Sequence, residues 1–147
     1  MRISTKGRYG TRLMLELALH YGEGSLSLKD IAKSQSISEK YLGHLVSPLK
    51  SAGLIKSIRG AEGGYYLTKA PAKITLKEVI SALEGSLSAV ECLDDSYICK
   101  RAESCVTRDI WYEMSAKIIE TLDSITLQDM VARQKEKKSQ EFLVYSI

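Results

Sequence analysis

The sequence predicts a mainly α-helical protein with one small β-hairpin, and three observations lead to this fold class. Apolar residues recur every three or four positions through much of the chain, which is typical of helices with one buried face. Two short runs rich in branched and aromatic residues, at 54–58 and 65–68, flank the glycine-rich stretch RGAEGG, as in a hairpin. The 147 residues are 44% hydrophobic and 27% charged, a balance typical of one soluble globular domain.

The N-terminal part of the chain predicts three helices in succession. The first is expected over about residues 7–21, on an apolar stripe formed by Tyr9, Leu13, Leu17 and Tyr21. Ser27 stands three residues before Asp30, which is capping-box spacing, and is expected to begin the second helix. Ser38 is positioned to cap the third helix, with Glu39 in the first turn, where the helix dipole favours a negative charge.

Pro48 falls inside the pattern of the third helix. Because proline lacks an N–H and clashes with the preceding turn, we expect a kink there, or a stop and a restart before residues 51–53. The two expected strands come next. Three short helices followed by a β-hairpin is the element order of a winged helix-turn-helix domain.

The C-terminal half predicts two capped helices and one long helix. Thr75 and Glu78 have capping-box spacing before a fourth helix, and Thr126 with Asp129 would cap a last one. Between them, a long helix is expected to begin near Thr107. Its apolar stripe is wide and contains Ile110, Trp111, Met114, Ile118 and Leu122.

This stripe is wider than a small winged domain needs, so we expect the helix to pair with its copy in a homodimer. The alternative is a helix folded back on its own domain. The expected organisation is a winged helix-turn-helix DNA-binding domain over 1–85, a cysteine-rich loop over 86–106, and a dimerisation helix with the C-terminal tail over 107–147. Together they are expected to form one structural domain.

Charge is unevenly distributed along the chain. Residues 1–70 carry 11 Lys and Arg against 5 Asp and Glu, a net of +6, whereas residues 71–147 have a net of −3. A basic half favours double-stranded DNA as the partner, although a solvated basic surface is the alternative. In a dimer, two recognition helices would read the half-sites of a palindromic operator, roughly 34 Å apart or a multiple of that distance.

The third helix would present four side chains to base edges or phosphates: Ser38, Lys40, Tyr41 and His44. Arg59 begins the glycine-rich loop, where it could enter a minor groove. The alternatives are a helical hairpin with a wet polar face and a solvated turn arginine. The full set of residues that we expect at the DNA surface is Lys6, Leu28, Lys29, Ser38, Glu39, Lys40, Tyr41, Gly43, His44, Ser47, Lys50 and Arg59.

Several classes of function are disfavoured. No apolar run reaches the roughly 20 residues that span a bilayer, and the N-terminus lacks the pattern of a secretory signal. A cytoplasmic location is therefore expected. An enzyme is not, because the chain has no phosphate-binding glycine loop, no Cys-x2-Cys redox pair and no Cys/His nucleophile arrangement.

All three cysteines lie in one polar segment, at Cys92, Cys99 and Cys105. Their spacing, Cys-x6-Cys-x5-Cys, lacks the close pair of a zinc knuckle, whereas iron–sulfur clusters accept looser spacings. From the residues alone, a cluster, a zinc ion, a redox thiol switch and inert cysteines all stay open. Neighbouring cations at 100 and 101 would favour both ligation and oxidation.

Five stretches, MRISTKGRYG, LKDIA, ISEKYL, GLIKSIRGAEGGYYL and EVISALEG, resemble the family of dimeric bacterial regulators that includes IscR and CymR. The resemblance covers nearly the whole chain. It implies a winged-helix dimer and DNA contacts at Ser38, Tyr41, His44 and Arg59. Cluster-binding members have three cysteines in this loop, which Cys92, Cys99 and Cys105 match; the resemblance therefore implies a [2Fe–2S] cluster.

Two positions depart from the pattern of the cluster-binding members. Gly43-His44 stands where many of them carry Glu-Gln, and Gly43 cannot accept a hydrogen bond from cytosine. Arg108 stands where a histidine often completes the cluster site, and a guanidinium has no lone pair to give. The remaining candidates for a fourth ligand are Asp94, Glu103, Asp109, an N-terminal residue of the partner chain and an exogenous thiol.

The expected function is a homodimeric transcription regulator that senses iron–sulfur status through the cluster and controls cluster-biogenesis genes. The CymR-like branch usually lacks the three cysteines, yet Pro48 and the ending EFLVYSI resemble that branch. The alternative is therefore a cluster-free repressor of cysteine and sulfur metabolism. Thiol redox state or a partner protein would control it, with a cysteine-biosynthesis enzyme or a cysteine desulfurase as the candidate partner.

Overall fold

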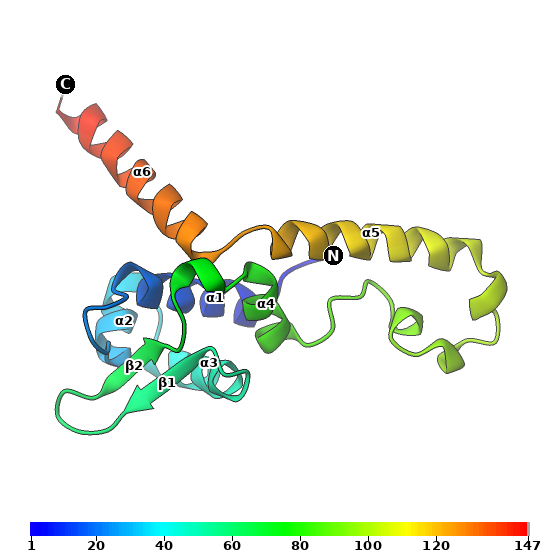
Figure 1. Ribbon diagram of the computed structural model, residues 1–147, viewed down its shortest axis with the longest axis horizontal. Helices are drawn as coiled ribbons and strands as arrows, with labels where there is room; N and C mark the ends of the chain where they lie inside the picture. The colour runs from blue at the N-terminus through cyan, green and yellow to red at the C-terminus, as the bar shows by residue number, and fades with distance from the viewer. Residues whose placement is uncertain (147) are drawn as a thin grey trace.

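The computed structural model describes residues 1–146 and has the element order that the sequence predicts (Figure 1). The order along the chain is α1 (Thr5–Leu19), α2 (Leu28–Gln35), α3 (Glu39–Ser51), β1 (Ile55–Ile58), β2 (Gly64–Leu67), α4 (Leu76–Glu84), α5 (Val106–Asp123) and α6 (Leu127–Tyr145). One 3₁₀ turn, Pro71–Lys73, precedes α4. Three more lie between α4 and α5, at Glu91–Leu93, Ser96–Ile98 and Ala102–Ser104. The predicted fold class is confirmed.

Side-chain caps fix the starts of five helices. The hydroxyls of Ser4, Ser27 and Ser38 accept from the backbone N–H three residues on, at the starts of α1, α2 and α3. Thr75 with Glu78, and Thr126 with Asp129, form complete capping boxes at α4 and α6. Each cap satisfies donors that the first helical turn leaves free, so these helix starts are encoded locally.

One core joins α1, α3, α4, the hairpin and the first turns of α6. α1 packs against α4, α6 and α3, and α3 packs against α2, α4 and β1. The largest fully buried side chains come from all of these elements: Leu13, Met14, Ile31, Leu42, Leu45, Leu49, Ile55, Ile74, Val79 and Leu127. Burial of these apolar side chains, rather than helix propensity alone, stabilises the domain.

The hairpin is a two-stranded antiparallel sheet in which Ile55 pairs with Leu67 and Ile58 with Gly64. Leu26 adds a short third pairing, because its N–H donates to the Tyr65 carbonyl (2.9 Å) and its carbonyl accepts from the Tyr65 N–H (2.7 Å). This bridge ties the loop before α2 to the wing.

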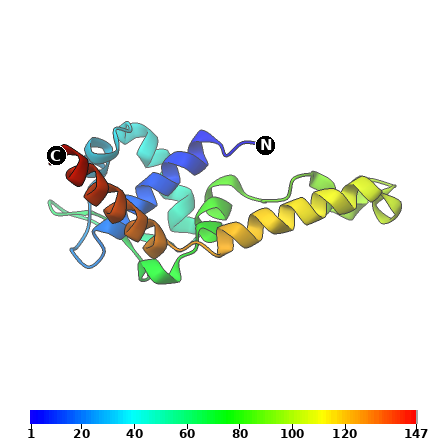
Figure 2. The same cartoon turned by 90° about the horizontal axis from the view of Figure 1, so that it is seen from above.

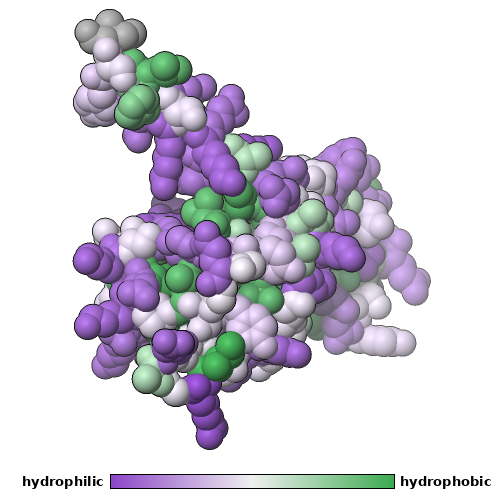
Figure 3. Space-filling view, turned by 60° about the vertical axis from the view of Figure 1, so that its left-hand side comes forward, coloured by the Kyte–Doolittle hydropathy of each residue, from purple (hydrophilic) through white to green (hydrophobic). Residues whose placement is uncertain are grey.

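α5 and the cysteine segment project from the core as one arm (Figures 1 and 2). After α4 the chain runs outward, turns at the far end, and returns along α5. α6 then begins on the core and stands out from it, with apolar side chains near its end (Figure 3). These exposed residues are Phe142, Leu143, Val144 and Tyr145.

At two helix boundaries the structure differs from what the sequence predicts. α1 ends at Leu19, and Tyr21 lies outside it with 51% of its surface exposed. α3 does not stop at Pro48 but continues to Ser51. Proline removes only the hydrogen bond to the carbonyl of His44, an exposed residue, while Leu45 and Leu49 hold the helix in the core. α6 continues to Tyr145, so the tail extends this helix.

Candidate nucleic-acid interface and cysteine segment

α3 presents one buried and one exposed face. Leu42, Leu45 and Leu49 are fully buried. On the other side, the side chains of Ser38, Lys40, His44 and Ser47 are exposed, and Tyr41 is half-buried. The polar residues at the start of the helix are therefore free to meet a ligand, as a recognition helix requires.

A cluster of side chains on α1 supports Tyr41. The Tyr41 ring packs edge-on against Tyr9, with ring centroids 5.7 Å apart and an interplanar angle of 88°. The guanidinium of Arg12 lies 5.5 Å from the centroid of the Tyr9 ring, and Arg12 also donates to both the side-chain and the backbone oxygen of Gln35. The helical periodicity places Tyr9 on the apolar stripe but does not reveal this network, because it depends on the crossing of α1 over the α2–α3 turn.

The wing places Arg59 directly after β1 in an exposed loop. The Lys50 ammonium donates to the Ser57 hydroxyl (3.2 Å), which joins the end of α3 to the wing strand. At the tip, the Ser25 hydroxyl donates to the Glu62 carbonyl (3.0 Å). One side-chain hydrogen bond thus joins α3 to the wing, and another joins the loop before α2 to the wing tip.

The other residues expected at the DNA surface also lie at the protein surface. Lys6, Lys29, Glu39, Gly43 and Lys50 are exposed, and Leu28 is half-buried. A Cβ atom added to Gly43 would meet no atom within 4 Å, so the space beside the recognition helix is open at this position. Their contacts with DNA stay predictions.

The three cysteines are free thiols, each partly exposed, on the segment that runs beside α5. Within residues 1–146, no three His, Cys, Asp or Glu side chains are grouped closely enough to hold a metal ion. The donor types fit an iron–sulfur cluster, whereas their arrangement does not. A cluster on these thiols therefore requires the segment to rearrange.

Cys105 differs from the other two cysteines because it stands at the start of α5. The Thr107 hydroxyl lies 3.2 Å from its sulfur. That hydroxyl, together with the backbone N–H of Arg108, lowers the pKa of the Cys105 thiol, against an opposing effect of the Asp109 carboxylate. Thiolate is the form that ligates and reacts, so these contacts activate the Cys105 sulfur.

Arg108 and Ser115 fasten the cysteine segment to α5. The Arg108 guanidinium donates to the Cys92 carbonyl (3.1 Å), and the buried Ser115 hydroxyl accepts from the Ala89 N–H (2.9 Å). The residue that departs from the histidine pattern thus has a structural contact in this chain.

The three acidic candidates for a fourth ligand are all exposed. Asp94 accepts from the hydroxyls of Ser86 and Ser88, both at 2.8 Å, and these bonds lower the pKa of its carboxyl. Asp94 would lose these bonds if it became a ligand. Glu103 and Asp109 carry no such contact among the hydrogen bonds of residues 1–146.

α5 also exposes a row of large apolar residues on the projecting arm. Ile110 is 51% exposed and Trp111 is 39% exposed, and Val106, Tyr112 and Met114 are exposed as well. The single chain covers only part of the stripe, at Ile118 and Leu122, which are half-buried. Contiguous apolar surface of this kind marks an interaction site.

A three-helix domain with an exposed recognition helix and a wing defines a winged helix-turn-helix DNA-binding protein. The Rrf2 family model, described as an iron-dependent transcriptional regulator, matches residues 3–133, and the chain therefore belongs to the Rrf2 family of transcription regulators. This confirms the family that the sequence motifs indicate. No helix within residues 1–146 has the length and hydropathy needed to cross a bilayer.

The chain is similar both to CymR and to IscR, the two regulators between which the sequence leaves the choice open. The HTH-type transcriptional regulator CymR of Bacillus subtilis (strain 168) is 49% identical over 132 residues, which cover 90% of this chain and 91% of the relative. The solved structure of CymR, the global cysteine regulator of B. subtilis, has a TM-score of 0.75 at 48% identity and covers 90% of this chain and 98% of that chain. The solved structure of T. potens IscR has a TM-score of 0.76 at 43% identity and covers 93% of this chain and 90% of that chain.

Proposed function

We propose that this DNA-binding transcription regulator acts as a homodimer on a palindromic operator in the cytoplasm. The observation that carries the proposal is the exposed apolar surface of the arm. α5 holds large apolar side chains outside the core, while the polar face of α3 is exposed to solvent. Pairing of two α5 helices removes this apolar surface from water and relates the two recognition helices by a two-fold axis. In this proposal, residues 1–85 bind DNA, residues 86–106 form the sensor segment, and residues 107–147 pair the two chains.

The proposed dimer is tested by placing a charged side chain on the apolar surface of α5. Ile110→Asp should convert the dimer to a monomer in sedimentation and weaken operator binding, because a carboxylate would be buried against the partner without a counter-charge. Tyr97→Asp is the matched control, since Tyr97 is 96% exposed and lies outside α5. A monomeric wild-type protein, or a dimer unchanged by Ile110→Asp, would contradict the proposal.

We propose the cysteine segment as the sensor, with a [2Fe–2S] cluster on Cys92, Cys99 and Cys105 and control of cluster-biogenesis genes. The thiol chemistry, the partial exposure of all three sulfurs and the similarity to IscR support it. The test is anaerobic purification with an absorption spectrum and an iron and sulfide assay. Brown protein with equal iron and sulfide is expected; pale protein without iron would refute the cluster.

The second candidate is a cluster-free repressor of cysteine and sulfur metabolism. The activated thiol of Cys105, the unassembled ligand set and the similarity to CymR favour it. In this case metal-free protein should bind the operator fully. Mild peroxide, or an added cysteine-biosynthesis enzyme or cysteine desulfurase, should change that affinity, whereas reconstitution with iron and sulfide should not.

A further inference from the structure

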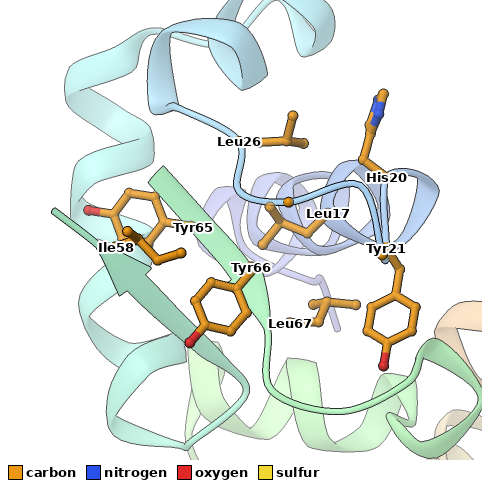
Figure 4. Close-up of a pocket in the computed structure, with 10 residues that line it drawn as sticks. Leu17, His20, Tyr21, Leu26, Ile58, Tyr65, Tyr66 and Leu67 are labelled. Atoms are coloured by element: carbon orange, nitrogen blue, oxygen red, sulfur yellow. The ribbon is translucent and has the colours of Figure 1, made fainter. Parts of the chain in front are cut away.

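A cavity of about 390 Å³ lies between the end of α1, the turn that follows it and the wing (Figure 4). Its lining includes Leu17, Tyr21, Leu26, Ile58, Tyr66 and Leu67. It shares no residue with the candidate DNA-binding set or with the cysteine segment. The cavity is large enough for a small organic molecule.

The cavity has an apolar floor and aromatic sides. Leu17 and Leu67 are buried, whereas Tyr21 and Ile58 expose 51% and 50% of their surfaces. In Figure 4 the rings of Tyr66 and Tyr21 lie on either side of Leu67, and both hydroxyls point toward the lower part of the view. Neither hydroxyl has a partner among the side-chain hydrogen bonds of residues 1–146, so both are available to a polar substituent on a ring between them.

The charges around the cavity indicate an uncharged occupant. His20 contributes the one imidazole of the lining, and both of its ring nitrogens are engaged: Nδ1 lies 2.8 Å from Glu23 and Nε2 lies 3.3 Å from Glu16. Neither carboxylate lines the cavity, and no Lys or Arg does. A charged ligand would lose hydration without gaining a counter-charge.

Three links join the cavity to the wing, which carries Arg59. Ile58 directly precedes Arg59 at the end of β1. The turn over the cavity is tied to the wing tip by the Ser25 hydroxyl and to β2 by the paired hydrogen bonds between Leu26 and Tyr65. An occupant that orders this turn therefore also orders the wing loop.

We propose that this cavity is an effector site for a small, uncharged aromatic molecule of one or two rings with a hydroxyl or carbonyl substituent. The ring lies between Tyr21 and Tyr66, and its binding changes the affinity of the wing for DNA. The binding step stands on the cavity alone, whereas its effect on DNA rests on the proposed function.

The probe is 1-naphthol, titrated calorimetrically into the whole protein at pH 7. One site per chain is expected. Tyr21→Ala and Tyr66→Ala should each weaken binding roughly tenfold, since each removes a stacking ring. Tyr21 lies outside the helices and strands, so its loss leaves the fold intact. Tyr97→Ala on the cysteine segment is the matched control and should bind as wild type.

Naphthalene-1-sulfonate has the same rings with a negative charge and should bind at least roughly tenfold more weakly. No saturable binding of 1-naphthol, equal binding of the sulfonate, or unchanged binding by Tyr21→Ala would overturn the site. Binding of 1-naphthol with unchanged operator affinity would overturn the coupling to the wing. Failure of the unliganded protein to bind DNA would count instead against the proposed function.

Discussion

Gly64→Ala tests whether the wing is held by the Leu26 bridge. A Cβ atom at Gly64 would collide with the carbonyl of Leu26 and lie 2.9 Å from the Ser27 nitrogen, and both are backbone atoms that cannot swing aside. Strand β2 must then move away and give up the two Leu26–Tyr65 hydrogen bonds, of 2.9 and 2.7 Å. At about 1 kcal/mol for each bond, the free energy of unfolding should fall by roughly 2 kcal/mol.

Gly43→Ala is the matched control, because it makes the same chemical change where a Cβ meets nothing within 4 Å. Gly43 lies inside α3, so alanine should raise the free energy of unfolding by about 1 kcal/mol through helix propensity. The assay is urea unfolding followed by circular dichroism, at one protein concentration because the proposed pairing would contribute to stability. Equal stability of the two variants would refute the reasoning, and Gly64→Ala should also weaken operator binding.

Four further predictions concern single side chains. Arg59→Ala should weaken DNA binding and reduce the slope of log K against log salt concentration by about 0.9, as loss of one phosphate or groove contact requires. Thr75→Ala should lower the free energy of unfolding by about 1 kcal/mol, since it removes the N-cap of α4. The pKa of Glu78 lies below its ordinary value of 4.5, so its contribution is full above pH 4.5 and is lost as the pH falls through the lower folded-state pKa. In metal-free protein, iodoacetamide at pH 7 should label Cys105 before the other cysteines, and Thr107→Ala should slow that labelling.

The predictions for Arg59, Glu78 and Cys105 each have a distinct contradicting outcome. Lys138, an exposed residue of α6, provides the control for Arg59, and Lys138→Ala should leave the salt slope unchanged. An equal reduction of the slope in both variants would contradict a specific role of the wing. For Glu78, partial burial opposes its charge, but the Thr75 N–H and the Lys69 ammonium outweigh it. A Glu78→Gln variant whose stability follows the same acid profile as wild type would contradict this. Uniform labelling of the cysteines would contradict the activation of Cys105.

Local chemistry explains why so much of the fold is predictable from the sequence. Ser38, Thr75 and Thr126 cap their helices through side chains only three residues away, so each boundary is visible in a short window. The same holds for the hairpin, where the glycine-rich stretch RGAEGG separates two runs rich in branched and aromatic residues. Of the two outcomes expected at Pro48, a kink or a stop and restart, the stop does not occur, because burial of its neighbours in the core outweighs one missing hydrogen bond.

The parts that the sequence does not reveal depend on contacts between distant residues. The Tyr9–Tyr41 packing and the Arg12–Gln35 bonds arise only when α1 crosses the α2–α3 turn. Arg108 is conspicuous in the sequence as a departure from a ligand pattern, whereas its bond to the Cys92 carbonyl depends on the path of the segment along α5. A sequence motif therefore indicates which side chains carry the chemistry. It does not show which residues from distant parts of the chain come into contact.

The most direct test of a paired DNA reader is selection from a random DNA pool, followed by native mass spectrometry of the selected complex. We predict enrichment of an inverted repeat and a complex that holds two chains, each of 16.3 kDa, on one duplex. A non-repeated sequence bound by a single chain would contradict the account.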